Sequence, residues 1–158
     1  MANTSILPIP TAVGSPRPRG SWLVARGLGA FAVLLLGVVH LDQYSGPYEA
    51  IPTIGTLFIV NFVAATLLGI ALLAPIEHVA GRWRGAAVAL VTASGMALAA
   101  GTVVLLLVSE RRPLFGFQEP GYDPTAIAVT KGAGVAAVAL LGASLVGRFT
   151  GTAPKRRW

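Results

Sequence analysis

The sequence predicts an all-α fold, a four-transmembrane-helix bundle with short loops and with both termini in the cytoplasm. The first observation behind this prediction is that four long apolar stretches fill the chain, at residues 22–39, 51–74, 85–108 and 125–147. A helix needs about 20 mostly apolar residues to cross about 30 Å of hydrocarbon. Backbone polar groups must be paired in lipid, so these stretches must be helical. The second observation is that the basic residues gather at alternate ends of the stretches.

Each stretch has its own boundary signals. The first contains one charged residue, Arg26. It is longer than the apolar core of a signal peptide, which has about 7–15 residues, so we expect a retained helix. This helix is predicted to end at His40, and a short external loop is predicted to run to Glu49. In the second, Pro52 falls in the first helical turn, where its missing N–H is harmless, and Pro75 ends the helix. The third carries no charge, and the fourth contains only Lys131.

These boundaries divide the chain into three parts. Residues 1–20 are rich in proline and predict a disordered cytoplasmic leader. Residues 21–149 form the transmembrane domain, and residues 150–158 form a basic cytoplasmic tail.

The orientation follows from the distribution of lysine and arginine, because basic residues remain on the cytoplasmic side of a membrane. One side has a single acid, Glu77, among its basic residues: Arg17, Arg19, Arg26, Arg82, Arg84, Arg148, Lys155, Arg156 and Arg157. The other side combines acids and bases: Asp42, Glu49, Glu110, Glu119 and Asp123 with Arg111, Arg112 and Lys131. The first side is therefore predicted to be cytoplasmic.

The composition limits the classes of function that are open to this chain. Only 11% of the residues are charged and 54% are hydrophobic, whereas soluble domains carry about 25% charged residues. The net charge of +6 is placed at helix ends, where it indicates contact with anionic lipid rather than nucleic acid. The chain contains no cysteine, and no phosphate-binding, nucleophile or metal motif is present. We therefore expect no enzymatic activity, cofactor or metal.

Small residues recur at intervals of four and predict close helix packing, because transmembrane helices associate where their backbones approach. The predicted packing positions are Gly85, Ala89, Ala93, Ala97, Gly101, Gly132 and Ala136. Packing within the chain is the preferred interpretation, and a dimer interface is the alternative. Asn61 lies about 15 Å into the second helix and is expected to hydrogen-bond to a neighbouring helix.

Two features are candidates for ligand binding. Lys131 lies about 9 Å into the fourth helix, where it either extends its amine to the outer surface or faces inward to serve a ligand with Glu49, Glu110 or Asp42. The second feature is the cluster of ionisable groups predicted at the outer face. The candidate residues are Lys131, His40, Asp42, Tyr48, Glu49, Glu110, Arg111 and Arg112. The alternative to ligand binding is that the acidic and basic groups of this cluster only neutralise one another.

Two segments carry a resemblance. The first segment comprises His40-Leu41 and the stretch from Tyr48 to Phe58, and its most specific part is Ile-Pro-Thr-Ile-Gly. The second segment is the stretch from Leu114 to Glu119. They resemble small four-helix integral membrane proteins of the high-GC Gram-positive (actinobacterial) type, a group without an assigned activity. The resemblance implies a four-helix architecture in a bacterial plasma membrane and transfers no catalytic residue.

Together these observations predict a non-enzymatic accessory or interaction subunit whose partners are the lipid bilayer and a membrane protein or a second copy of the chain. The alternative is a small carrier or ligand-binding membrane protein that uses Lys131 and the histidine and carboxylates of the outer face.

Overall fold

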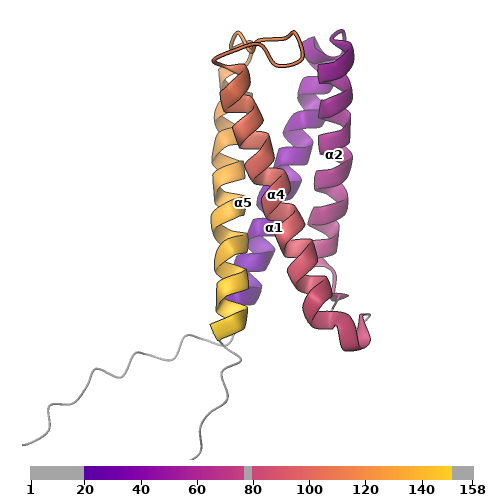
Figure 1. The fold of residues 1–158 in the computed structure, drawn as a ribbon, viewed down its shortest axis with the longest axis vertical. Helices are drawn as coiled ribbons and strands as arrows, with labels where there is room; N and C mark the ends of the chain where they lie inside the picture. Colours follow the sequence, from indigo (N-terminus) through magenta and orange to yellow (C-terminus); the bar gives the residue numbers. More distant parts are fainter. Residues whose placement is uncertain (1–19, 77–79, 151–158) are drawn as a thin grey trace, which may run out of the picture.

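The computed structural model describes residues 20–76 and 80–150, which form four long helices side by side (Figure 1). These helices are α1 (Ser21–Gln43), α2 (Pro52–Leu73), α4 (Arg84–Ser109) and α5 (Pro124–Thr150). A π-helical turn, η1 (Tyr44–Tyr48), follows α1, and a 3-10 turn, η2 (Gly81–Trp83), precedes α4. All four long helices are long and apolar enough to cross a membrane. The predicted all-α, four-transmembrane-helix bundle is confirmed.

Proline places both ends of α2 where the sequence predicts them. Pro52 is in the first turn. The helix ends at Leu73, and Ala74 is extended (ψ 149°) because the ring of Pro75 disfavours helical backbone in the residue before it.

The predicted end of the first helix at His40 is wrong. The chain remains helical through Gln43 and then through η1, and the amide of Tyr44 donates to the carbonyls of His40 and Leu41. Helical geometry breaks only at Gly46 (φ −112°, ψ −124°). Continued helix keeps the backbone groups paired at the edge of the apolar region, where unpaired ones are costly.

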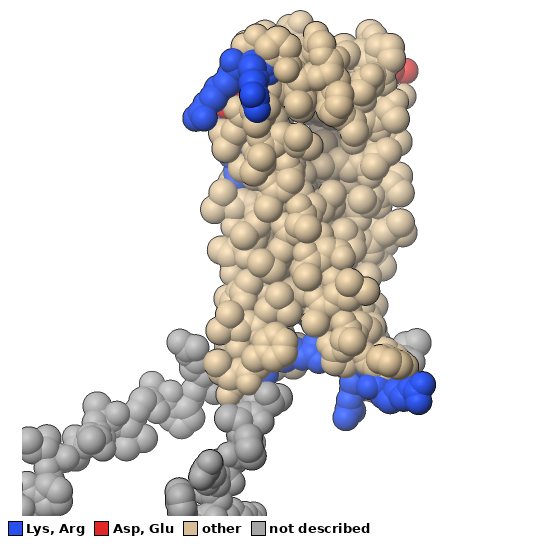
Figure 2. All heavy atoms as spheres, in the orientation of Figure 1, with Lys and Arg blue, Asp and Glu red and all other residues tan. Residues whose placement is uncertain are grey.

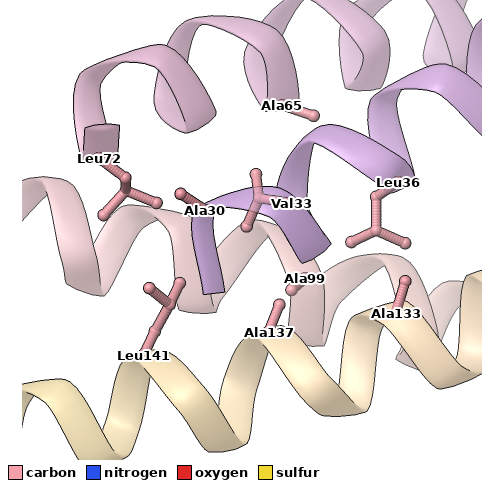
Figure 3. Packing of buried hydrophobic residues seen from close by; sticks show 9 residues of the cluster. All are labelled: Ala30, Val33, Leu36, Ala65, Leu72, Ala99, Ala133, Ala137 and Leu141. Carbon is pink, nitrogen blue, oxygen red and sulfur yellow. The ribbon is translucent and has the colours of Figure 1, made fainter. Parts of the chain in front are cut away.

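The core lies on the central axis of the bundle. Figure 3 shows three α1 residues, Ala30, Val33 and Leu36, surrounded by side chains of the other three helices. Those side chains are Ala65, Leu72, Ala99, Ala133, Ala137 and Leu141. Most are small, because α1 packs closely along both α2 and α5.

The predicted small-residue stripes do not form these close contacts. Gly85, Ala93, Ala97 and Gly132 are exposed, and Ala89, Gly101 and Ala136 are half-buried. Close approach occurs on neighbouring faces of the same helices. A methyl group added at Gly134 of α5 would overlap Val103 of α4, and one added at Gly29 of α1 would lie 2.6 Å from the side chain of Leu141. The predicted packing within the chain is therefore wrong for the four exposed positions, because the closest approaches involve other faces of the helices.

The outer surface between the two ends is apolar. Figure 2 shows an uncharged band between basic groups at one end and charges of both signs at the other. The start of α1 and the end of α5 lie at the same end of the bundle (Figure 1). The predicted leader and tail lie outside the described residues, apart from Gly20 and Thr150, and Glu77 also lies outside them.

Candidate ligand-binding site

A cavity of about 270 Å³ lies inside the half of the bundle nearest the loop that joins α4 to α5. All four helices contribute to its wall. Most of the lining is apolar, and its polar members are His40, Gln43, Tyr48, Asn61, Thr102, Ser109, Glu119 and Thr130. This combination of a large apolar wall and a few converging polar groups is typical of small-molecule sites.

A bridge between α2 and α4 lies near the inner end of the cavity. The Asn61 Nδ2 group donates to the Thr102 hydroxyl at 2.7 Å, which fulfils the predicted inter-helix role of this amide. From there the two helices diverge toward the loops (Figure 1). Leu57, Val60 and Leu105 line the cavity and are also exposed on the lipid-facing surface. The cavity therefore opens sideways, between α2 and α4.

The roof is formed by the loop between α4 and α5. Leu114 and Phe117 exchange two backbone hydrogen bonds (2.7 and 3.0 Å) around Phe115 and Gly116, both of which have positive φ (52° and 82°). Two consecutive positive φ values define a tight hairpin turn that normally requires glycine at one position. This turn brings the side chains of Leu114 and Phe117 to the cavity and leaves that of Phe115 outside, 62% exposed.

Glu119 fixes the roof to Tyr48, in the segment that joins α1 to α2. Its Oε2 accepts a hydrogen bond from the Tyr48 hydroxyl at 2.5 Å, and its Oε1 accepts from the amides of Gly121 (2.8 Å) and Tyr122 (3.2 Å). Both oxygens of this carboxyl group are therefore engaged in hydrogen bonds. The Tyr48 ring is stacked on Phe58 at 4.6 Å. Both Tyr48 and Glu119 are buried.

A second polar bridge joins the loop ends of α1 and α5. Gln43 donates through Nε2 to Asp123 at 3.0 Å. The other oxygen of Asp123 accepts from the amides of Ala126 and Thr125 (both 2.9 Å) and so caps α5. The bond from Ala126, aided by those from Gln43 and Thr125 and opposed by desolvation, holds the pKa of Asp123 below its usual value.

His40 contributes a polar group to the cavity wall. Its Nδ1 lies 2.7 Å from the Leu36 carbonyl, and its ring lies 4.9 Å from that of Phe58. A carbonyl oxygen only accepts, so Nδ1 carries the proton, and in a neutral ring Nε2 is left as an acceptor. Among the described residues, no side chain or backbone group is hydrogen-bonded to Nε2.

The other predicted site residues lie apart from the cavity. The Lys131 amine pairs with Glu110 at 2.6 Å, and neither residue lines the cavity. Asp42 is exposed and accepts a hydrogen bond from Gln43 at 3.3 Å. Glu49, Arg111 and Arg112 are exposed. The structure thus separates the predicted cluster and brings only His40 and Tyr48 into the cavity.

Several cavity residues were absent from the predicted ligand-binding set: Gln43, Phe58, Thr102, Phe117, Glu119 and Thr130. Three of them, Phe58, Thr102 and Thr130, lie in predicted helices and resemble ordinary helix residues in the sequence. The available signal was the Phe115-Gly116 turn between Leu114 and Phe117, which predicts that the loop folds back. Within residues 20–76 and 80–150, no group of three or more His, Cys, Asp or Glu residues is placed to hold a metal ion.

The architecture is that of a four-helix bundle, long and apolar enough to span a membrane, with a mostly apolar internal cavity. Comparison with protein-family models, with curated proteins and with solved structures finds no match to this chain.

Proposed function

We propose that this protein is a membrane-embedded binding protein for a small lipid-soluble molecule, which it holds in the cavity beneath the loop between α4 and α5. The observation that carries the proposal is the cavity itself, about 270 Å³ in volume, mostly apolar and open sideways. Helical bundles rarely leave so large a space unfilled, because interiors are close-packed. The proposal corresponds to the carrier or ligand-binding alternative, with His40 and Tyr48 retained and Lys131 left out.

Binding is favoured over catalysis by the state of the polar groups. The Glu119 carboxylate holds the Tyr48 hydroxyl and two loop amides, and Gln43 holds Asp123. These groups stabilise the roof and the helix ends, and a reaction would have to break their bonds.

We further propose that the bundle lies in a bacterial plasma membrane with both termini in the cytoplasm. The support is the basic character of the end where α1 begins, which carries Arg82, Arg84 and Arg148, together with the sequence resemblance. The cavity would then lie toward the outside. A reporter enzyme that is active only in the cytoplasm, fused after Trp158, tests the orientation. Activity is expected, and its absence contradicts the proposal.

The binding proposal is tested by closing the mouth of the cavity. Val60 lines the cavity and is 56% exposed, so Val60→Trp should block entry without disturbing the core. Val63, on the same helix, is 46% exposed and does not line the cavity, so Val63→Trp is the matched control. In phosphatidylcholine vesicles, a photoreactive diazirine derivative of hexadecanol should label cavity residues in the wild type and the control.

The variant Val60→Trp should lose most of this labelling. Equal labelling of all three proteins, or labelling spread evenly over the lipid-facing surface, would show that the cavity does not bind the probe. Mass spectrometry of protein extracted gently in lipid discs supplies a second readout, since a retained native ligand should be depleted in Val60→Trp alone.

An accessory or interaction subunit is the second candidate function. It is favoured by the exposed small residues of α4, namely Gly85, Ala93 and Ala97, which leave room for another transmembrane helix. Ala93→Phe should then weaken an oligomer or complex seen in mild detergent, whereas Leu67→Phe, at a 64% exposed position on α2, should not. A protein that always runs as a monomer contradicts this candidate.

A further inference from the structure

We infer that the cavity selects a neutral lipid-soluble molecule with a hydrogen-bond-donating head, of the class of long-chain or phenolic alcohols, over molecules with an anionic head. This inference rests on the proposed binding function and adds the chemistry of the ligand. It depends on three features of the structure: the entry path, the unsatisfied acceptor on His40 and the charge around the cavity.

The entry path admits apolar molecules. The mouth between α2 and α4 is bordered by Leu57, Val60 and Leu105, all exposed to lipid. The opposite route, from the loop side, is covered by Leu114, Phe117 and the other residues of the roof. A ligand that enters between Val60 and Leu105 must already be dissolved in the bilayer, where charged groups are costly.

The cavity wall offers an acceptor that lacks a donor. The Nδ1 bond of His40 to Leu36 leaves Nε2 as an acceptor. His40 lines the cavity, and no side chain or backbone group of the described residues is hydrogen-bonded to Nε2. A hydroxyl or N–H group on a ligand can satisfy this acceptor, and an ether oxygen cannot.

The charge around the cavity opposes an anion. Glu119 is the only Asp or Glu among the lining residues, and Lys and Arg are absent from that lining. The Lys131 amine, which could have balanced an anion, is engaged by Glu110 away from the cavity. An anionic head would therefore meet a carboxylate without any compensating cation.

Three matched diazirine probes test the inference on the wild-type protein in phosphatidylcholine vesicles: hexadecanol, its methyl ether and hexadecyl sulfate, which stays ionised. Photolabelled residues are mapped by mass spectrometry. We expect the alcohol to label cavity residues about fivefold more than the ether, the effect of one hydrogen bond of about 1 kcal/mol. The sulfate should label them at least about tenfold less than the alcohol.

Two variants assign the preference to named groups. His40→Phe retains an aromatic contact with Phe58 and removes Nε2, so alcohol labelling should fall to the level of the ether while ether labelling is unchanged. Glu119→Gln replaces the carboxyl group by a neutral amide, so the ratio of sulfate labelling to alcohol labelling should rise.

The outcomes separate the inference from the function on which it rests. Equal labelling by all three probes in the wild type overturns the head-group preference and leaves the cavity as a binding site. A His40→Phe protein that loses alcohol and ether labelling together also overturns it, since the effect would then be structural. Failure of every probe to label the cavity refutes the proposed function itself.

Discussion

The hydrogen bond between Tyr48 and Glu119 offers the sharpest test of how the roof is held. Tyr48→Phe removes the hydroxyl and keeps the ring, so the stacking on Phe58 (4.6 Å) and the edge contact with Phe117 (5.8 Å) survive. The change therefore isolates one bond of 2.5 Å between two buried residues.

The expected loss of stability depends on the hydrogen bonds that Glu119 keeps in Tyr48→Phe. Hydrogen bonds to charged groups contribute about 1.5–3 kcal/mol. The carboxylate keeps its bonds to the amides of Gly121 and Tyr122, so it is not left without partners, and we expect a loss of about 2 kcal/mol in the stability of the roof. Because 1.4 kcal/mol is a factor of ten, the open state of the loop should become about 30-fold more populated.

Hydrogen exchange measured in detergent micelles reads this opening directly. The amides of Gly121 and Tyr122, which donate to Glu119, should exchange about 30-fold faster in Tyr48→Phe, while amides in the centre of α1 remain protected. Tyr122→Phe is the matched control, since Tyr122 is 61% exposed and its replacement should change stability by less than about 0.5 kcal/mol.

Unchanged exchange in Tyr48→Phe would refute the reasoning that this bond holds the roof. So would an equal acceleration in Tyr122→Phe, because the loss of an exposed hydroxyl would then matter as much as the loss of a buried one.

Three further predictions concern the bundle and its edges. Gly55→Ala places a methyl group 2.8 Å from the carbonyl oxygen of Tyr48 and should lower the unfolding free energy by about 1–3 kcal/mol in a detergent titration, whereas Gly101→Ala, with no atom within 4 Å, should not lower it. The lowered pKa of Asp123 means that its stabilising effect is present above about pH 4, the unfolded value, and is lost as the pH falls through the folded value. Thermal melts should therefore drop in acid for the wild type and less for Asp123→Asn; identical acid profiles would argue against this. Lys131→Met should leave photolabelling of the cavity unchanged, and a clear decrease would show that the amine reaches the ligand.

The prediction of the ligand site shows where sequence reasoning fails. Lys131 was chosen as a candidate because intramembrane charges are commonly functional, and Glu110 because it belongs to the cluster of ionisable groups at the outer face. The structure pairs them with each other on the flank of the bundle at 2.6 Å. Conversely, Glu119 is buried at the roof, although nothing in composition distinguishes it from the exposed Glu49. Burial depends on how the loop folds over the helices, and the sequence alone does not specify that fold.

The small-residue stripes failed for a related reason. An interval of four places Gly85, Ala93 and Ala97 on one helical face, but several faces of α4 carry small residues. Which face is buried depends on the rotation of α4 against α5, and contacts such as that of Gly134 with Val103 fix this rotation. Periodicity identifies a face that can pack closely, and only the neighbouring helix determines which one does.

The sequence by itself determined the four helices, the proline-defined ends of α2 and the concentration of charge at the two ends of the bundle. These properties follow from local rules: the length needed to cross hydrocarbon, the backbone limits of proline and the cost of charge in lipid. Tertiary structure alone decided the cavity, its sideways opening and the burial of Glu119. Those features arise where side chains distant in the chain meet, such as Tyr48 with Glu119 and Asn61 with Thr102, and no local rule fixes such meetings.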